Sequence, residues 1–193
     1  FKLQQISFPI RAFNTYSPYP EKGTHMYYKT KKMIVLAAMC AIAYVVMLVG
    51  RINVVLFLKY DPKDVIIAMG GFMFGPLSAV IISVLVSFLE MLTASDTAWW
   101  GLIMNIISSC SFAAVASLIY KKKHTFAGAV TGLLTGWLFT SGIMMLWNYL
   151  VTPIYMGIAR EVVAGMLLPY FLPFNLFKGG VNTVLTLLLY KPV

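Results

Sequence analysis

Three polar side chains occur at helical spacing in an apolar segment near the end of the chain. Asn175, Lys178 and Asn182 stand at positions i, i+3 and i+7, which places them on one face of a helix. Lys178 precedes Tyr190, where the apolar segment ends, by 12 residues, or about 18 Å of helix. A charge at this depth in a bilayer costs about 2.5–3.5 kcal/mol on insertion scales, so its presence needs a reason. Asn175 and Lys178 can together offer donors and an acceptor to a planar, imide-like group, and we favour a bound ligand for them.

Other polar side chains in the apolar segments have both structural and ligand-binding interpretations. Asn148 and Glu90 lie near the ends of two such segments, and Asn105 lies within another. Asn side chains commonly join membrane helices through hydrogen bonds, which is the slightly favoured interpretation of Asn105 and weighs equally with binding for Asn182. An ion pair between Glu90 and Lys178 would also be a purely structural explanation. The polar set of the candidate site is Asn175, Lys178, Asn148, Asn105 and Glu90.

Catalytic chemistry finds little support in the sequence. There is no GxxxxGK[ST] phosphate loop and no Ser/His/Asp, HExxH or paired-carboxylate arrangement, and the two histidines are His25 and His124. Cys40 and Cys110 lie inside apolar runs without a CxxC motif and are interpreted as core residues. A proton or sodium relay would need more buried acids than Glu90. We expect no enzyme activity and no cofactor, and uptake against a gradient would need energy from a partner protein.

The composition is typical of a membrane protein. Of the 193 residues, 60% are hydrophobic and 11% are charged, and the mean hydropathy is +0.83. A soluble domain has about 25% charged residues, so a soluble enzyme and a disordered chain are both excluded. The formal net charge is +9, and seven lysines fall in three clusters (29–32, 121–123 and 191) at the ends of apolar runs. The positive-inside rule predicts such clusters at cytoplasmic flanks, so we expect contact with a lipid bilayer and not with nucleic acid.

The placement of charge also predicts the topology. Gly75 and Pro76 interrupt the second apolar stretch, which could form one kinked helix or two helices joined by a tight turn. Two helices give six spans with all three lysine clusters and both termini on the cytoplasmic side, whereas one kinked helix separates the first cluster from the others. We therefore predict an all-α integral membrane protein with six transmembrane helices. The predicted spans are 33–49, 65–74, 76–92, 99–120, 127–150 and 174–190.

The predicted outer side has the features of a small-molecule site. It holds three loops, at 50–64, 91–98 and 151–172, together with Trp147, Tyr149, Tyr155 and Phe174. Aromatic residues are common at membrane interfaces in any case. An apolar, aromatic-walled pocket with a few convergent polar groups is nevertheless what a small ligand requires. We predict a site near the extracellular face for a flat, partly polar molecule.

Residues 1–27 are expected to lie outside the membrane domain. The first 24 residues are mixed in character, contain prolines and lack the basic start and apolar core of a signal peptide. We interpret 1–27 as a leader ahead of a natural start near Met26, or as a disordered N-terminus. Residues 28–193 would form a single six-helix domain. On its first helix, Ala37 and Ala41 are spaced for the close approach of another helix, from within the protein or from a partner.

The sequence resembles the substrate-binding (S) components of energy-coupling-factor (ECF) vitamin transporters, and most of all the riboflavin-specific ones. The resemblance covers about residues 28–193 and is strongest in the last of five stretches. These are LKYDPKD at 58–64, GFMFGP at 71–76, GLIMN at 101–105, WNY at 147–149 and PFNLFKGG at 173–180. The family fold is a six-helix membrane protein with its vitamin bound near the extracellular face, which agrees with the six spans inferred from charge.

The resemblance implies that the chain captures a vitamin. It would be the riboflavin-binding subunit of an ECF-type ABC importer in the bacterial plasma membrane, with riboflavin as its transported ligand and not as a cofactor. By resemblance, Asn175, Lys178 and Asn148 would hydrogen-bond the isoalloxazine ring. The residues lining the site from the first loop would be Leu58, Lys59, Tyr60 and Asp61.

The resemblance also implies partner proteins. A transmembrane coupling protein would contact Ala37 and Ala41, and two ATP-binding subunits would supply energy while the loaded subunit topples in the membrane and releases its vitamin inward. Two alternatives stay open. The chain could be an S component for another vitamin or a flavin derivative. It could also be a small membrane protein of another class, in which Asn175 and Lys178 are structural.

Overall fold

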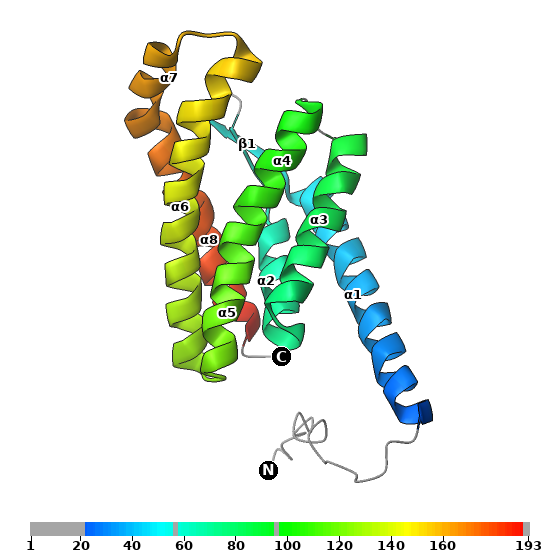
Figure 1. Cartoon of the computed structure of the whole chain (residues 1–193). Helices are drawn as coiled ribbons and strands as arrows, with labels where there is room; N and C mark the ends of the chain where they lie inside the picture. The colour runs from blue at the N-terminus through cyan, green and yellow to red at the C-terminus, as the bar shows by residue number, and fades with distance from the viewer. Residues whose placement is uncertain (1–21, 56–57, 95–96, 191–193) are drawn as a thin grey trace.

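The described chain is built almost entirely of helices. The computed structural model describes residues 22–55, 58–94 and 97–190 (Figure 1). Most of the expected leader, at 1–27, and Lys191 of the third lysine cluster lie outside the described residues. Helix α1 begins at Lys22, inside the range expected for the leader. The domain boundary at residue 28 stays a prediction.

The elements include two π-helical segments that join helices without a break. Because η2 joins α4 to α5 and η3 joins α7 to α8, each of these pairs forms one continuous rod. The helices are α1 (Lys22–Gly50), α2 (Lys63–Phe74), α3 (Pro76–Thr93), α4 (Ala98–Ser109), α5 (Val115–Lys122), α6 (Phe126–Met156), α7 (Arg160–Met166) and α8 (Leu172–Tyr190). The remaining elements are β1 (Ile52–Val55), β2 (Leu58–Tyr60), η2 (Cys110–Ala114) and η3 (Leu167–Phe171).

Successive rods alternate in direction along the bundle (Figure 1). Helices α1, α3 and α6 run toward the end that carries β1 and α7, which we call the hairpin end. Helices α2, α4–α5 and α8 run back toward the other end. This second end, which we call the lysine end, holds the beginning of α1, the α5–α6 connection and the end of α8 (Figure 1). Two of the lysine clusters therefore belong to the same end of the molecule.

The turn after α2 confirms that two helices meet at Gly75 and Pro76. Gly75 has a φ of +92°, a conformation that residues with a Cβ rarely adopt. Its N–H donates to the carbonyl of Gly71 at 2.8 Å where α2 ends, and Pro76 begins α3. In the part of the chain that the structure describes, five helical segments are long and apolar enough to cross a membrane. Helix α2 is not one of them, because its 12 residues span only about 18 Å of a core about 30 Å thick.

The prediction of a loop over 151–172 is wrong, because helix occupies most of this range. Helix α6 continues to Met156, and the α7–α8 rod begins at Arg160, well before the predicted start of the last span at 174. Pro153 and Pro169 suggest helix ends, but membrane helices tolerate proline because neighbouring side chains and local π-helical adjustments satisfy the freed backbone groups. Pro169 lies within η3, where the hydrogen-bond pattern already departs from that of an α-helix.

The first connection also differs from the all-α prediction, since it forms a short antiparallel hairpin. The paired residues are Ile52 with Tyr60, Asn53 with Lys59 and Val55 with Leu58. The β-branched residues of β1 favour a strand. Leu58 and Tyr60 are buried in a cluster with Val163, Phe171 and Phe174, so the hairpin packs onto the α7–α8 rod.

Small residues allow α6 to lie very close to η2 and α5. A Cβ added to Gly132 would lie 2.6 Å from the carbonyl oxygen of Ala116, and one added to Gly136 would lie 2.5 Å from that of Phe112. Both contacts involve backbone atoms, which cannot rotate away as a side chain could. Such close approach through small residues is common between membrane helices.

We expect Gly132→Ala and Gly136→Ala to lower the thermal unfolding temperature of the protein in mild detergent. The added Cβ atoms would overpack a fixed backbone, which destabilises by about 1–3 kcal/mol. Gly142→Ala is the matched control on the same helix, because nothing lies within 4 Å of its added Cβ and alanine favours helix over glycine. Equal unfolding temperatures in all three variants would contradict the close contact between α5 and α6.

Candidate functional site

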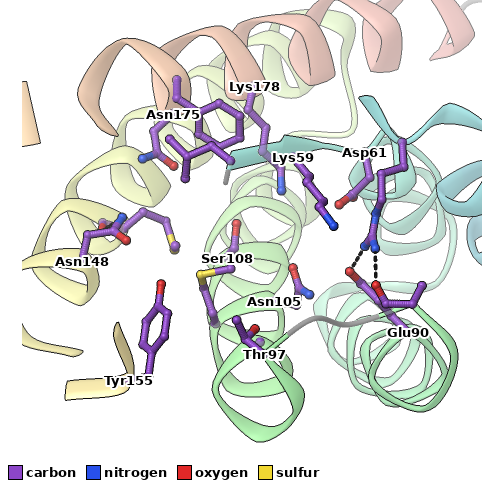
Figure 2. Close-up of a pocket in the computed structure, with 17 residues that line it drawn as sticks. Lys59, Asp61, Glu90, Thr97, Asn105, Ser108, Asn148, Tyr155, Asn175 and Lys178 are labelled. Carbon is purple, nitrogen blue, oxygen red and sulfur yellow. Dashed lines mark hydrogen bonds and ion pairs between the residues drawn. The ribbon is translucent and has the colours of Figure 1, made fainter. Parts of the chain in front are cut away.

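A cavity opens among side chains at the hairpin end of the bundle (Figure 2). It offers about 150 Å³ to the centres of water molecules, roughly ten times the ~10–15 Å³ that one water needs. Its walls come from the hairpin, from the ends of α3, α4 and α6, and from the beginning of α8. The lining residues are Arg51, Leu58, Lys59, Asp61, Glu90, Ala94, Thr97, Gly101, Met104, Asn105, Ser108, Met144, Asn148, Tyr155, Phe174, Asn175 and Lys178.

The fold brings together eight of the nine side chains that the sequence suggests for ligand binding. They are Leu58, Lys59 and Asp61 from the first connection, Glu90 from α3, Asn105 from α4, Asn148 from α6, and Asn175 and Lys178 from α8. Tyr60 is the exception, because it is buried behind the cavity and its hydroxyl donates to Oδ1 of Asn182 at 3.0 Å. The contact of any of these residues with a ligand stays a prediction.

Asn175 and Asn148, from the neighbouring helices α8 and α6, keep part of their hydrogen-bonding capacity for the cavity. Nδ2 of Asn175 donates to the carbonyl of Phe171 at 2.7 Å, and Nδ2 of Asn148 donates to the carbonyl of Met144 at 2.8 Å. Oδ1 of Asn148 also accepts from the hydroxyl of Thr152 at 3.0 Å. Because an amide carries two N–H groups and an oxygen with two lone pairs, each side chain still has a free N–H and acceptor capacity. These bonds to the preceding helical turn fix both amides as they face the space in Figure 2.

Lys178 has a buried acid beside it. Its Nζ lies 3.5 Å from Oδ2 of Asp64, and its side chain is 12% exposed. Asp64, in the first turn of α2, also accepts from the hydroxyl of Ser109 at 2.5 Å and from Nδ2 of Asn182 at 3.3 Å. Asp64 is therefore the charged partner of Lys178. The sequence analysis placed Asp64 in the first loop, at 50–64, and did not identify this pairing.

A second set of ion pairs ties the first connection to α3. Glu90 accepts from Arg51 through one carboxylate oxygen and from Lys63 through the other, so the suggested pairing of Glu90 with Lys178 is replaced by these two bonds. Arg51 also donates to the carbonyl of Ala94 at 2.7 Å. Lys63 is fully buried. The sequence analysis did not identify Arg51 and Lys63 as ion-pair partners, although Lys63 begins α2, whose residues from Val65 on are apolar.

Three bases and three acids form the ion pairs beside the cavity. Arg51, Lys63 and Lys178 stand against Asp61, Asp64 and Glu90, and we call these six side chains the charge network. Nζ of Lys63 lies 3.8 Å from Oδ1 of Asp61. Burial raises the pKa of Asp61, but the nearby charges of Lys63, Lys178 and Arg51 outweigh burial and hold this pKa below its ordinary value. The acid is therefore charged at neutral pH.

The rest of the cavity wall suits a flat ring system. Leu58, Met104, Met144 and Phe174 contribute apolar surface, and Tyr155 stands near the opening, where its ring stacks on Trp100 with centroids 6.4 Å apart. Within the described residues, no group of three His, Cys, Asp or Glu side chains could hold a metal ion. The arrangement can bind a flat molecule that has polar edges.

The suggested partner-coupling residues lie on α1 and do not line this cavity. Ala37 and Ala41 are both exposed in the described chain, so their small side chains are accessible. Their contact with a partner protein stays a prediction.

Comparison with known proteins places the chain in a transporter family. The family profile for "ECF transporter, substrate-specific component" matches residues 31–190. The chain is 27% identical to the riboflavin transporter RibU of Staphylococcus aureus (strain TCH60) over 172 residues, covering 84% of this chain and 90% of that protein. It is 28% identical to the riboflavin transporter FmnP of Bacillus subtilis (strain 168) over 178 residues, covering 84% of this chain and 91% of that protein.

A solved structure shares the fold. It is described as the S component of a bacterial ECF transporter, and it superposes with a TM-score of 0.73 and 27% identity over 85% of this chain and 95% of its own. These relatives are transporters and not enzymes, and several long apolar helices make the present chain a multi-pass protein of the plasma membrane. The chain belongs to the family of ECF transporter substrate-specific components.

Proposed function

We propose that the ligand of this S component is riboflavin. Two relatives similar over most of their length are riboflavin transporters. The observation that carries the proposal is the position of Asn175 and Lys178, which line one cavity from successive turns of α8, with Asn148 on the wall formed by α6. In this proposal riboflavin is cargo, and no cofactor takes part.

The isoalloxazine ring offers the edge that these side chains suit. Its pyrimidine part carries carbonyl and imide N–H groups, so Lys178 donates to a carbonyl while Asn175 both donates and accepts. Asn148 meets another polar edge of the ring. Leu58 and Phe174 cover the apolar faces.

The other predicted residues shape the remainder of the site. Lys59, Asn105 and Asp61 are placed for the polar ribityl chain or for waters around it, and Glu90 acts through its ion pairs with Arg51 and Lys63. Tyr60 acts through Asn182, because its own side chain does not line the cavity.

In this proposal the chain crosses the membrane six times, with both termini in the cytoplasm. The alternating directions of the rods and the common position of two lysine clusters support this topology (Figure 1). Helix α2 is the short crossing, and nine of its 12 residues are buried by other elements, so little of it needs to meet lipid. The cavity, at the hairpin end, then opens toward the outside.

Uptake needs partners that this chain does not itself provide. Membership of the ECF family implies an energy-coupling module, and we propose that it consists of a transmembrane coupling protein and two ATP-binding subunits. The exposed pair Ala37 and Ala41 is the proposed contact of the coupling protein, because a small-residue surface admits another helix at close range. The loaded subunit then reorients and releases riboflavin inward.

We expect Lys178→Met and Asn175→Leu to weaken riboflavin binding. Losing a hydrogen bond to a charged group removes about 1.5–3 kcal/mol, which is roughly a 10- to 150-fold increase in Kd for Lys178→Met. Quenching of riboflavin fluorescence by the purified protein measures the Kd. Lys123→Met is the matched lysine control, because Lys123 is exposed at the lysine end. Unchanged Kd values in both site variants, with binding by the parent chain, would remove these residues from the site.

We expect Ala37→Trp and Ala41→Trp to leave riboflavin binding unchanged and to abolish uptake by cells. A bulky side chain on this surface would hold a partner helix away, while the cavity stays intact. Ile42→Trp is the control, because Ile42 is also exposed on α1 but points about 120° away from the alanine pair. Full uptake by both alanine variants at normal expression would exclude a coupling role for this face.

A further inference from the structure

Lys178 borders two cavities and not one. Besides the large cavity, it lines a small one of about 10 Å³, lined also by Asp64, Asn182, Trp137 and Gly179. This smaller space lies farther along α8 toward the lysine end and has room for about one water. A flexible lysine side chain between two spaces has more than one direction open to it, so its ammonium must be held if it is to meet a ligand.

Asp64 is the group placed to hold that ammonium. It lines the small cavity but not the large one, so it stands behind Lys178 as seen from the ligand space. It is 1% exposed, and its Oδ2 lies 3.5 Å from Nζ of Lys178. The hydroxyl of Ser109 fixes its other oxygen at 2.5 Å. A buried carboxylate anchored in this way is a fixed counter-charge.

Asn182 extends this contact to the hairpin. The hydroxyl of Tyr60 donates to Oδ1 of Asn182 at 3.0 Å, so the Nδ2 of the same amide is directed at Asp64, 3.3 Å away. Tyr60 belongs to β2, and its ring packs edge-on against that of Phe177 on α8. A continuous series of contacts therefore runs from Tyr60 through Asn182 and Asp64 to Lys178.

We propose that Asp64 is a positioning residue for ligand binding, which keeps Lys178 charged and directed into the large cavity, and that Tyr60 and Asn182 tie this pair to the hairpin. The inference rests on the proposed function, since it assigns Lys178 to the ligand. It also gives Tyr60, which the resemblance assigned to the lining of the site, a role from behind the cavity. Asn182, for which the sequence left structure and binding equally weighted, acts as a link within the protein.

Charge balance makes the proposal testable by a double-mutant cycle. The charge network sums to zero, so Asp64→Asn leaves one uncompensated positive charge and Lys178→Met leaves one uncompensated negative charge, whereas the double variant is neutral again. Breaking a buried pair is more harmful than replacing both partners. The double variant is therefore expected to unfold at a higher temperature than Lys178→Met alone.

The ligand measurements separate positioning from a general loss of structure. We expect Asp64→Asn to raise the Kd for riboflavin about 10- to 100-fold in the parent chain, and to change it less than 2-fold in the Lys178→Met background, because Asp64 acts only through the lysine. The visible absorption bands of bound riboflavin should also shift toward those seen in Lys178→Met, since the ammonium no longer meets the ring. Loss of stability alone does not move these bands.

Tyr60→Phe provides a milder variant, which keeps the test decisive even if Asp64→Asn does not fold. It removes only the hydroxyl that orients Asn182, and we expect a 3- to 10-fold higher Kd that disappears in the Lys178→Met background. Ser117→Ala is the control for losing a buried hydroxyl elsewhere, because Ser117 bonds only its own helix, at the carbonyl of Ala113. It should leave the Kd unchanged.

Each outcome decides between the inference and the function on which it rests. If the parent chain does not bind riboflavin, the proposed function fails and the inference fails with it. Suppose that the parent binds riboflavin and that Lys178→Met weakens binding. The inference alone is overturned if Asp64→Asn then changes the Kd equally in both backgrounds or in neither. Where Asp64→Asn does not fold, the same criterion applies to Tyr60→Phe. Loss of the effect in the Lys178→Met background supports it.

Discussion

Six buried or nearly buried charged side chains must be paired with one another inside a membrane bundle. This pairing determines how the elements at the hairpin end are arranged. Arg51, Lys63 and Lys178 oppose Asp61, Asp64 and Glu90 at a depth where an unpaired charge is very costly. The six side chains come from the first connection, the beginning of α2, α3 and α8. Satisfying them fixes these elements relative to one another, and the cavity opens directly beside the network.

The two ends of the bundle differ in how their helices pack. Toward the lysine end, Gly132 and Gly136 let α6 contact the backbone of η2 and α5, and the hydroxyls of Tyr120 and Tyr190 meet at 3.0 Å beside a cluster of buried apolar side chains. Toward the hairpin end, polar side chains hold the helices apart around an open space. A ligand that enters from the hairpin end therefore meets a closed floor, which suits a subunit that captures its cargo and does not form a pore.

The sequence predicted the parts of the site that follow from helical spacing, and missed those that depend on tertiary contacts. Asn175 and Lys178 were identifiable because polar residues in an apolar helix are rare and need partners. Gly75 and Pro76 likewise marked a true turn, since that backbone conformation favours glycine. Asp64 appeared to be an ordinary loop charge, because nothing in its local sequence shows that α2 begins inside the bundle. The helical course of 151–172 was missed because its prolines resemble helix ends.

The cavity and the proposed partner contact lie on different parts of the chain. The cavity is built on the hairpin end, whereas Ala37 and Ala41 are exposed near the middle of α1 and do not line it. Helix α1 connects the two regions, since it ends at Gly50 and the next residue, Arg51, bonds to Glu90 in the charge network. Under the proposed function, in which partner subunits supply the energy, a helix anchored at one end in the charge network is a mechanically suitable place to receive it.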